Sequence, residues 1–159
     1  MTIREIKKED FDNYLELKKQ LFDSEMETAK KDSFIKFYIE KIIRKEQLEE
    51  FSKMLKKEDS IFIVAEENKE IIGFLFGFLN YYIVNDSKRK FGYLDTMVIS
   101  KKYRGKGVGT KLHQEFIEWL KFKKIKWAVL QVDDKNYAGV EFYKKEKYYP
   151  TELRMAKKI

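Results

Sequence analysis

The segment Tyr93–Lys121, YLDTMVISKKYRGKGVGTKLHQEFIEWLK, constrains the fold of this chain more than any other. An apolar stretch with the composition of a strand leads into a basic turn that contains Gly105, Gly107 and Gly109. After the turn, apolar residues recur at helical spacing: Val108, Leu112, Phe116, Trp119 and Leu120. A strand, a turn and a helix in this order predict a crossover to a parallel strand in the same sheet.

The glycine turn is suited to an anion. Glycines let backbone N–H groups approach a ligand closely, because they have no Cβ. The helix adds its positive N-terminal end, and Arg104 and Lys106 add charge. A triphosphatase phosphate loop needs Gly-Lys-Ser/Thr, whereas Gly109-Thr110-Lys111 reverses that order. A dinucleotide fingerprint needs a third glycine where Thr110 stands.

Hydrophobic patterns predict an α/β (α+β) fold in the element order β-α-α-β-β-β-α-β-α-β. We expect a mixed, mostly antiparallel sheet of about six strands with helices on both faces. The expected strands are Thr2–Lys7, Ile61–Glu66, Ile71–Val84, Phe91–Ile99, Lys126–Val132 and Tyr149–Lys157. The expected helices begin at Asp10 or Asp12, at Ser33 (one long helix to Leu55 or two in tandem), after the glycine turn, and within DDKNYAGVEFYKKEK.

Length and composition narrow the class of protein. The 159 residues suit a single domain over residues 1–159. No residue is cysteine, which excludes disulfides, a thiolate nucleophile and thiolate metal sites, and we expect no metal. No apolar run reaches membrane-spanning length, so we expect a soluble, cytoplasmic protein without a membrane partner. The net charge is +7, but lysine is spread along the chain, so nucleic acid is not the expected partner.

Two spaced motifs resemble those of the GNAT superfamily, the acyl-CoA-dependent N-acyltransferases. The pyrophosphate motif of that family, Gln/Arg-x-x-Gly-x-Gly/Ala, is matched by Arg104, Gly107 and Gly109. The hydrophobic strand end that precedes it is matched by Met97 and Ile99. The order of the predicted elements also matches, so the resemblance spans essentially the whole chain.

The second motif, Asn-x-x-Ala-x-x-x-Tyr, is approximated by NYAGVEFY, with Asn136, Ala138 and Tyr143. Ala138 stands one position early. Lys147-Tyr148 replaces the usual Gly-Phe after the tyrosine, so we expect the turn there to differ, and Lys101 replaces the usual proline before YRG.

The resemblance implies that acetyl-CoA binds in a cleft between the strands Phe91–Ile99 and Lys126–Val132, which splay at their C-terminal ends. Pantetheine would pair with the opened strand edge, and the N–H near Val98 or Ile99 would polarise the thioester carbonyl. The implied cofactor-binding residues are Met97, Val98, Ile99, Arg104, Gly105, Lys106, Gly107, Val108, Gly109, Thr110, Asn136 and Tyr143.

An amine acceptor must lose a proton before it attacks, so the chemistry needs a base. Asp95 shares strand alternation with Met97 and Ile99 and is the expected base; Glu66 and Glu25 are alternatives. Tyr143 matches the family tyrosine that protonates the departing CoA thiolate.

The absence of cysteine favours direct transfer of the acetyl group to an amine of a small molecule or a protein. The acceptor pocket is expected near Tyr81, the loop Asp23–Asp32 and the long helix. A non-catalytic acyl-CoA sensor or an RNA-binding module on the same fold is the alternative, and a homodimer stays open.

Overall fold

The computed structural model describes residues 1–28, 44–153 and 155–157, which fall into two compact units. The first unit consists of Met1–Leu21 and Ile43–Gln131, and the second of Phe22–Ile42 and Val132–Ile159. A single domain over residues 1–159 therefore stays a prediction. Within the described ranges, no helix combines the length and the apolar character needed to cross a membrane.

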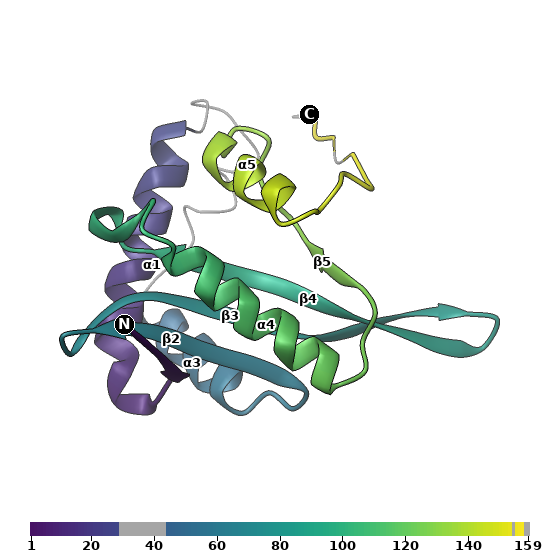
Figure 1. Ribbon diagram of the computed structural model, residues 1–159, viewed down its shortest axis with the longest axis horizontal. Coiled ribbons are helices and arrows are strands. Elements are labelled where there is room, and N and C mark those ends of the chain that lie inside the picture. Colours follow the sequence, from purple (N-terminus) through teal and green to yellow (C-terminus); the bar gives the residue numbers. More distant parts are fainter. Residues whose placement is uncertain (29–43, 154, 158–159) are drawn as a thin grey trace. The chain divides into compact units, whose positions relative to one another are not determined.

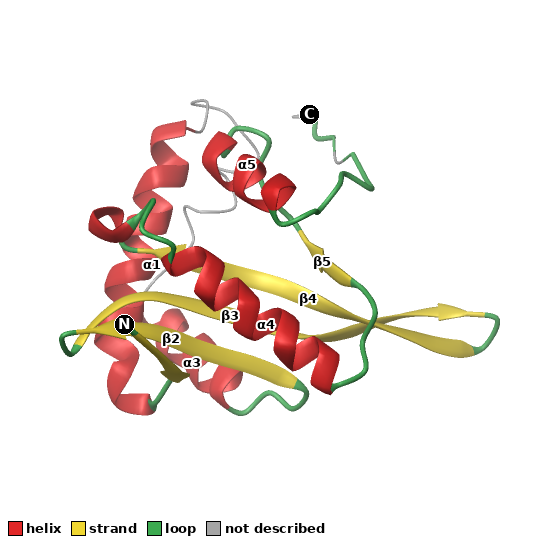
Figure 2. Ribbon diagram, viewed as in Figure 1, coloured by secondary structure: helices red, strands yellow, loops and turns green. Residues whose placement is uncertain are grey.

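Every described strand lies in the first unit and belongs to one sheet of five strands, in the order β1-β2-β3-β4-β5 (Figures 1 and 2). The strands β1 to β4 pair antiparallel with their neighbours, and β4 pairs parallel with β5. The predicted mixed sheet and the predicted crossover are confirmed. The element bounds are β1 Thr2–Glu5, α1 Phe11–Thr28, α3 Arg44–Leu55, β2 Ser60–Glu67, β3 Glu70–Val84, β4 Ser87–Ile99, α4 Val108–Phe122, β5 Ala128–Leu130 and α5 Tyr137–Lys145.

One face of the sheet packs against α3 and the first part of α1, which lie behind the sheet in Figure 1. Aromatic side chains fill this layer: Tyr14 of α1 has its ring centroid 4.8 Å from Phe51 of α3 and 4.9 Å from Phe74 of β3. All three residues are 2% exposed or less. Their burial fixes α1 and α3 to this face.

The opposite face of the sheet carries α4, so helices cover both faces as predicted (Figure 1). The sheet presents glycines beneath this helix, where an added side chain would collide with α4 at Gly77 and Gly92 and with β4 at Gly73. Cβ atoms built at Gly73, Gly77 and Gly92 would lie 3.4, 2.7 and 2.3 Å from side-chain atoms of Leu112, Phe116 and Leu120. These three α4 residues recur every four positions and are 3% exposed or less.

A β-bulge interrupts the pairing of β3 with β4. Phe76 pairs with Thr96, but the next residue, Gly77, pairs with Leu94. Asp95 is therefore the extra residue on β4, and it reverses the alternation of the strand at this point. Before and after the bulge, side chains still alternate between the two faces of the sheet. Across the bulge, residues two positions apart no longer share a face.

Three sequence predictions about the elements need correction. Residues 149–153 and 155–157 form no strand, and Leu153 and Met155 are each 85% exposed. The strand expected over Lys126–Val132 is reduced to β5 at the edge of the sheet, and Trp127 is 62% exposed. The first helix continues through Thr28, where a loop was expected. The part of the long helix between Ser33 and Ile42 lies outside the described residues, and α3 confirms its end at Leu55.

Candidate functional site

The glycine turn connects the end of β4 to the start of α4 and takes an unusual backbone path. Gly105 has a φ angle of 74° and Gly107 one of 80°, both in the left-handed region that side chains disfavour. A Cβ atom at either position would meet nothing within 4 Å. Glycine is thus required at these two positions by the backbone conformation, and the space above them is open to a ligand.

The first turn of α4 leaves N–H groups without acceptors in their own helix. Gly107 caps the helix, and its carbonyl accepts the hydrogen bond of Lys111 N–H at 3.1 Å. The N–H groups of Val108, Gly109 and Thr110 precede that bond, so α4 provides no carbonyl for them. Together with the positive end of the helix dipole, they suit a phosphate group.

Basic side chains surround the turn, and one of them also holds it in place. Arg104 Nε donates a hydrogen bond of 3.2 Å to the carbonyl of Ile99, which fastens the turn to the end of β4. Lys106 Nζ lies 5.1 Å from the centre of the Tyr103 ring, and Tyr103 in turn donates to Glu70 at 3.2 Å. The Lys106 ammonium is thereby held beside the turn.

Next to this turn, no strand among the described residues lies beside one edge of β4. The pairing of β4 with β5 runs only from Gly92–Ala128 to Leu94–Leu130, whereas β4 continues to Ile99. Between Asp95 and Ile99, no described strand pairs with that edge. Its backbone groups can therefore pair with the amides of an extended ligand, as an added strand would.

The bulge separates side chains that sequence alternation had placed together. Ile99 pairs with Gly73, and a Cβ on that glycine would lie 3.0 Å from Ile99 Cδ1 on the α4 face. Met97 shares that face by alternation. Asp95 lies against Phe76 on the α3 face, so the expectation that it points with Met97 and Ile99 is wrong.

The face that carries Asp95 has an open depression of about 370 Å³. Asp95 is exposed there and accepts a hydrogen bond of 3.0 Å from the Thr96 hydroxyl. Burial raises the pKa of the adjacent Tyr14, and the carboxylates of Glu50 and Asp95 raise it further. The residues that line the depression are Glu50, Lys53, Met54, Lys57, Phe76 and Asp95.

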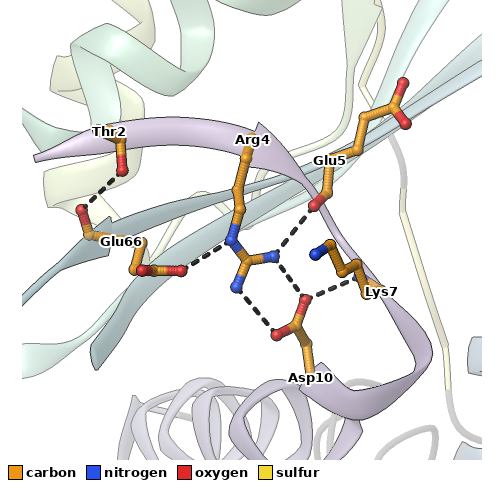
Figure 3. Close-up of polar contacts among 6 residues, drawn as sticks. All are labelled: Thr2, Arg4, Glu5, Lys7, Asp10 and Glu66. Atoms are coloured by element: carbon orange, nitrogen blue, oxygen red, sulfur yellow. Dashed lines mark hydrogen bonds and ion pairs between the residues drawn. The ribbon is translucent and has the colours of Figure 1, made fainter. Parts of the chain in front are cut away.

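Glu66, an alternative base, is occupied by an ion-pair network at the start of the sheet (Figure 3). Arg4 Nε donates to Glu66 at 2.7 Å, and its two terminal nitrogens donate to Asp10 at 2.7 and 3.0 Å. Asp10 also accepts the backbone N–H of Lys7 at 2.7 Å. Because of these contacts, Glu66 has a structural role in the sheet. The other alternative, Glu25, lies on α1 in the second unit.

The second unit holds the residues of the second motif. Asn136 caps α5, because its side-chain oxygen accepts the N–H of Gly139 at 3.0 Å. Tyr143 is half-buried, with its ring centroid 5.6 Å from that of Tyr148, and burial raises the pKa of Tyr143 to about 12. The phenol therefore keeps its proton at neutral pH. The capping bond of Asn136 is a structural reason for the asparagine in this motif.

Residues 19–147 match the sequence profile of the Acetyltransferase (GNAT) family. The chain belongs to this family. It is 30% identical over 163 residues to an uncharacterized N-acetyltransferase of Methanocaldococcus jannaschii, an alignment that covers 99% of the chain and 67% of the relative. As a GNAT acetyltransferase, the chain is an enzyme that uses acetyl-CoA.

Solved structures show the same GNAT fold. A tetramutant of the BH1408 protein of Bacillus halodurans has a TM-score of 0.85 at 19% identity, with both chains fully covered. An aminoglycoside N-acetyltransferase crystallised in complex with CoA has a TM-score of 0.70 at 16% identity, and covers 99% of this chain and 98% of its own. At these identities the likeness concerns the fold alone.

Sequence reasoning missed most of the depression beside Asp95. The long helix was expected to contribute, but Lys53 and Lys57 were not singled out, because exposed lysines are common along the whole chain. Tyr81, expected near the acceptor, lies 45% exposed on the outer part of the β3–β4 hairpin. The lining residues come from α3, β3 and β4 and the segment just after α3, and no local sequence pattern shows that these segments meet at one depression.

Proposed function

We propose that this GNAT enzyme transfers an acetyl group from acetyl-CoA directly to a primary amine of a small molecule, with Asp95 as the base. The observation that carries the proposal is the opened edge of β4. At one end of this edge lies Asp95, whose depression is on the α3 face of the sheet. At its other end lies the glycine turn, which leads into α4 on the opposite face.

The residues of the first unit fit CoA. The N–H groups from Gly105 to Thr110, with Lys106 beside them, are suited to the pyrophosphate. The edge of β4 between Met97 and Ile99 is suited to the pantetheine amides, and the N–H of Ile99 to the thioester carbonyl, because the N–H of Val98 points toward β3. Acetyl-CoA supplies the acetyl group as a thioester, whose carbonyl carbon bonds to the amine as the C–S bond breaks.

Asp95 has the properties that a base needs here. It is exposed to the depression in which an acceptor would lie, and it makes no ion pair with any residue in the described ranges. An Asp side chain can hold an ammonium by charge and then accept its proton, directly or through a water molecule. The depression of about 370 Å³ has the size of a small-molecule site, which favours a small acceptor over a protein.

Tyr143 is assigned to the departing thiolate by the motif that it shares with the family. With a pKa of about 12, its phenol is a weaker acid than a thiol, whose pKa is roughly 8.5. Full transfer of the proton would cost about 5 kcal/mol. We therefore assign to Tyr143 the donation of a hydrogen bond to the thiolate, with the proton finally supplied by solvent.

Release of free thiol from acetyl-CoA in the presence of amines tests the proposal. Asp95→Asn should lower kcat by about 10²- to 10⁴-fold and leave the Kd for CoA unchanged, because the variant keeps the shape but loses the base. Glu49→Gln is the matched control, since it neutralises an exposed carboxylate of α3 that does not line the depression. Equal activity of Asp95→Asn and the parent would remove Asp95 from the mechanism.

A further inference from the structure

The depression beside Asp95 carries charges of both signs. Asp95 on β4 brings a carboxylate, whereas Lys53 on α3 and Lys57 just beyond its end bring ammonium groups. Met54 and Phe76, which are 8% and 3% exposed, add an apolar lining. This combination limits the kind of amine that the depression can hold.

A further acidic residue of the lining, Glu50, is already neutralised from within the protein. Its Oε2 lies 3.1 Å from Nζ of Lys18, whose side chain is only 10% exposed. A cation with so little access to water is stabilised by such a carboxylate. Glu50 is therefore committed to Lys18, and Asp95 is the carboxylate of the lining that faces a ligand without an ion-pair partner among the described residues.

The two lysines keep their positive charge for a ligand. Lys53 is exposed and makes no ion pair within the part of the chain that the structure describes. Lys57 Nζ lies 4.0 Å from the centre of the Phe78 ring. Such a cation–π contact holds the ammonium in place without cancelling its charge. Beside Asp95, the lining thus has an excess of positive charge.

We propose that the acceptor of this enzyme is a small amine that also carries an anionic group, of the amino acid type. Its ammonium lies at Asp95, and its anion lies at Lys53 and Lys57. The inference rests on the proposed acetyl transfer and adds the substrate class. A polycation, such as a diamine or an aminoglycoside, would gain from Asp95 but be repelled by both lysines.

Matched acceptors that differ only in charge test this proposal. With the full chain and acetyl-CoA, thiol release is compared for 4-aminobutyrate, butylamine and 1,4-diaminobutane, and for phenylalanine and phenethylamine. We expect the kcat/KM of each aminocarboxylate to exceed that of its uncharged-tail counterpart by about tenfold, with the diamine lowest. Phosphoethanolamine against ethylamine distinguishes a phosphate from a carboxylate as the preferred anion.

Charge-reversal variants distinguish the effect of the two lysines from the effect of the protein's overall positive charge. Lys53→Glu and Lys57→Glu should each lower kcat/KM for aminocarboxylates by about tenfold and raise it for diamines, with the KM for acetyl-CoA unchanged. Lys56→Glu is the matched control: it makes the same change next to Lys57, but Lys56 lines a separate depression with Ile6 and Leu55. Its acceptor preference should equal that of the parent.

The outcomes distinguish the inference from the proposed function. Two outcomes would overturn the substrate class and leave the proposed acetyl transfer intact. In the first, the enzyme acetylates diamines faster than aminocarboxylates. In the second, Lys53→Glu and Lys57→Glu do not alter the preference among acceptors. If no amine is acetylated, the proposed function fails. Thermal shift in the presence of CoA then decides the inference: stabilisation by aminocarboxylates over the corresponding amines supports it, and equal or reversed stabilisation overturns it.

Discussion

Leu120 of α4 occupies the space that a side chain at Gly92 of β4 would need: a Cβ on Gly92 would lie 2.3 Å from Leu120 Cδ2. Gly92 also stands where β4 begins to pair with β5, and its N–H donates to the carbonyl of Trp127 at 2.9 Å. The close approach of α4 to the sheet therefore depends on this glycine. Gly92 thus helps to set the position of α4, the helix that begins directly after the glycine turn.

Gly92→Ala should destabilise the fold by about 1–3 kcal/mol, because the added methyl group overpacks a buried contact. Leu120→Ala should cost about 2–5 kcal/mol through the cavity that it leaves. Urea unfolding of both variants and of the double variant checks the relationship. The double variant should cost less than the sum of the two, since each change relieves the other. Strict additivity would mean that the two residues are not in contact.

The network of Arg4 predicts a pH dependence of stability. The hydrogen bonds that Arg4 donates to Asp10 are the main cause that lowers the pKa of Asp10 below its ordinary value of 3.8. A carboxyl group with a lowered pKa in the folded state stabilises the protein fully above the unfolded value, and this stabilisation is lost as the pH falls through the folded value. The free energy of unfolding should therefore decline below a pH of about 4.

Asp10→Asn should cost about 1.5–3 kcal/mol at pH 7, because Arg4 loses a charged partner. Its deficit relative to the parent should shrink as the pH falls below about 4 and through the lowered pKa of Asp10, where the carboxylate of the parent becomes protonated. Glu9→Gln, which removes an exposed carboxylate next to Asp10, is the control and should leave the pH profile unchanged. A deficit of Asp10→Asn that is the same at every pH would contradict this account.

Tyr143→Phe tests the hydrogen bond that we assign to the thiolate. Without the phenol, kcat should fall by about tenfold or more, while the Kd for CoA changes little, because the donor acts on charge that develops during the reaction. Tyr148→Phe removes the neighbouring hydroxyl and should retain most of the activity. Stopped-flow measurement of single turnovers separates the chemical step from product release. An unaltered single-turnover rate would exclude Tyr143 from the reaction.

The sequence predicted the elements with strong local patterns. The alternation of β2 and β3, the crossover from β4 through α4 to β5, and the glycine turn were all correct, because neighbouring residues determine each of them. The segment Tyr149–Lys157 alternates too, yet its described residues form no strand. Alternation predicts a strand only where a partner edge is present, and the sequence does not show where edges lie.

The candidate site was predicted only in part, because it too depends on structure that local sequence patterns do not show. Glycine positions revealed the turn, and Asp95 was selected, but its side chain was expected on the wrong face. One bulged residue reverses the alternation of a strand, and no hydrophobic pattern marks it. Lys53 and Lys57 line the same depression as Asp95 only in the folded chain, and the sequence does not show that these distant segments come together.

The turn before α4 is the part of the molecule that we propose holds the pyrophosphate of CoA. Calorimetric titration with CoA and with pantetheine, of the parent and of Gly107→Val, tests this proposal most directly. The valine must adopt a φ near 80°, which strains the turn and displaces its N–H groups. We predict that the parent binds CoA more tightly than pantetheine, and that Gly107→Val weakens CoA about tenfold and leaves pantetheine unchanged. Equal affinity of the parent for CoA and pantetheine, unaltered by Gly107→Val, would contradict the account.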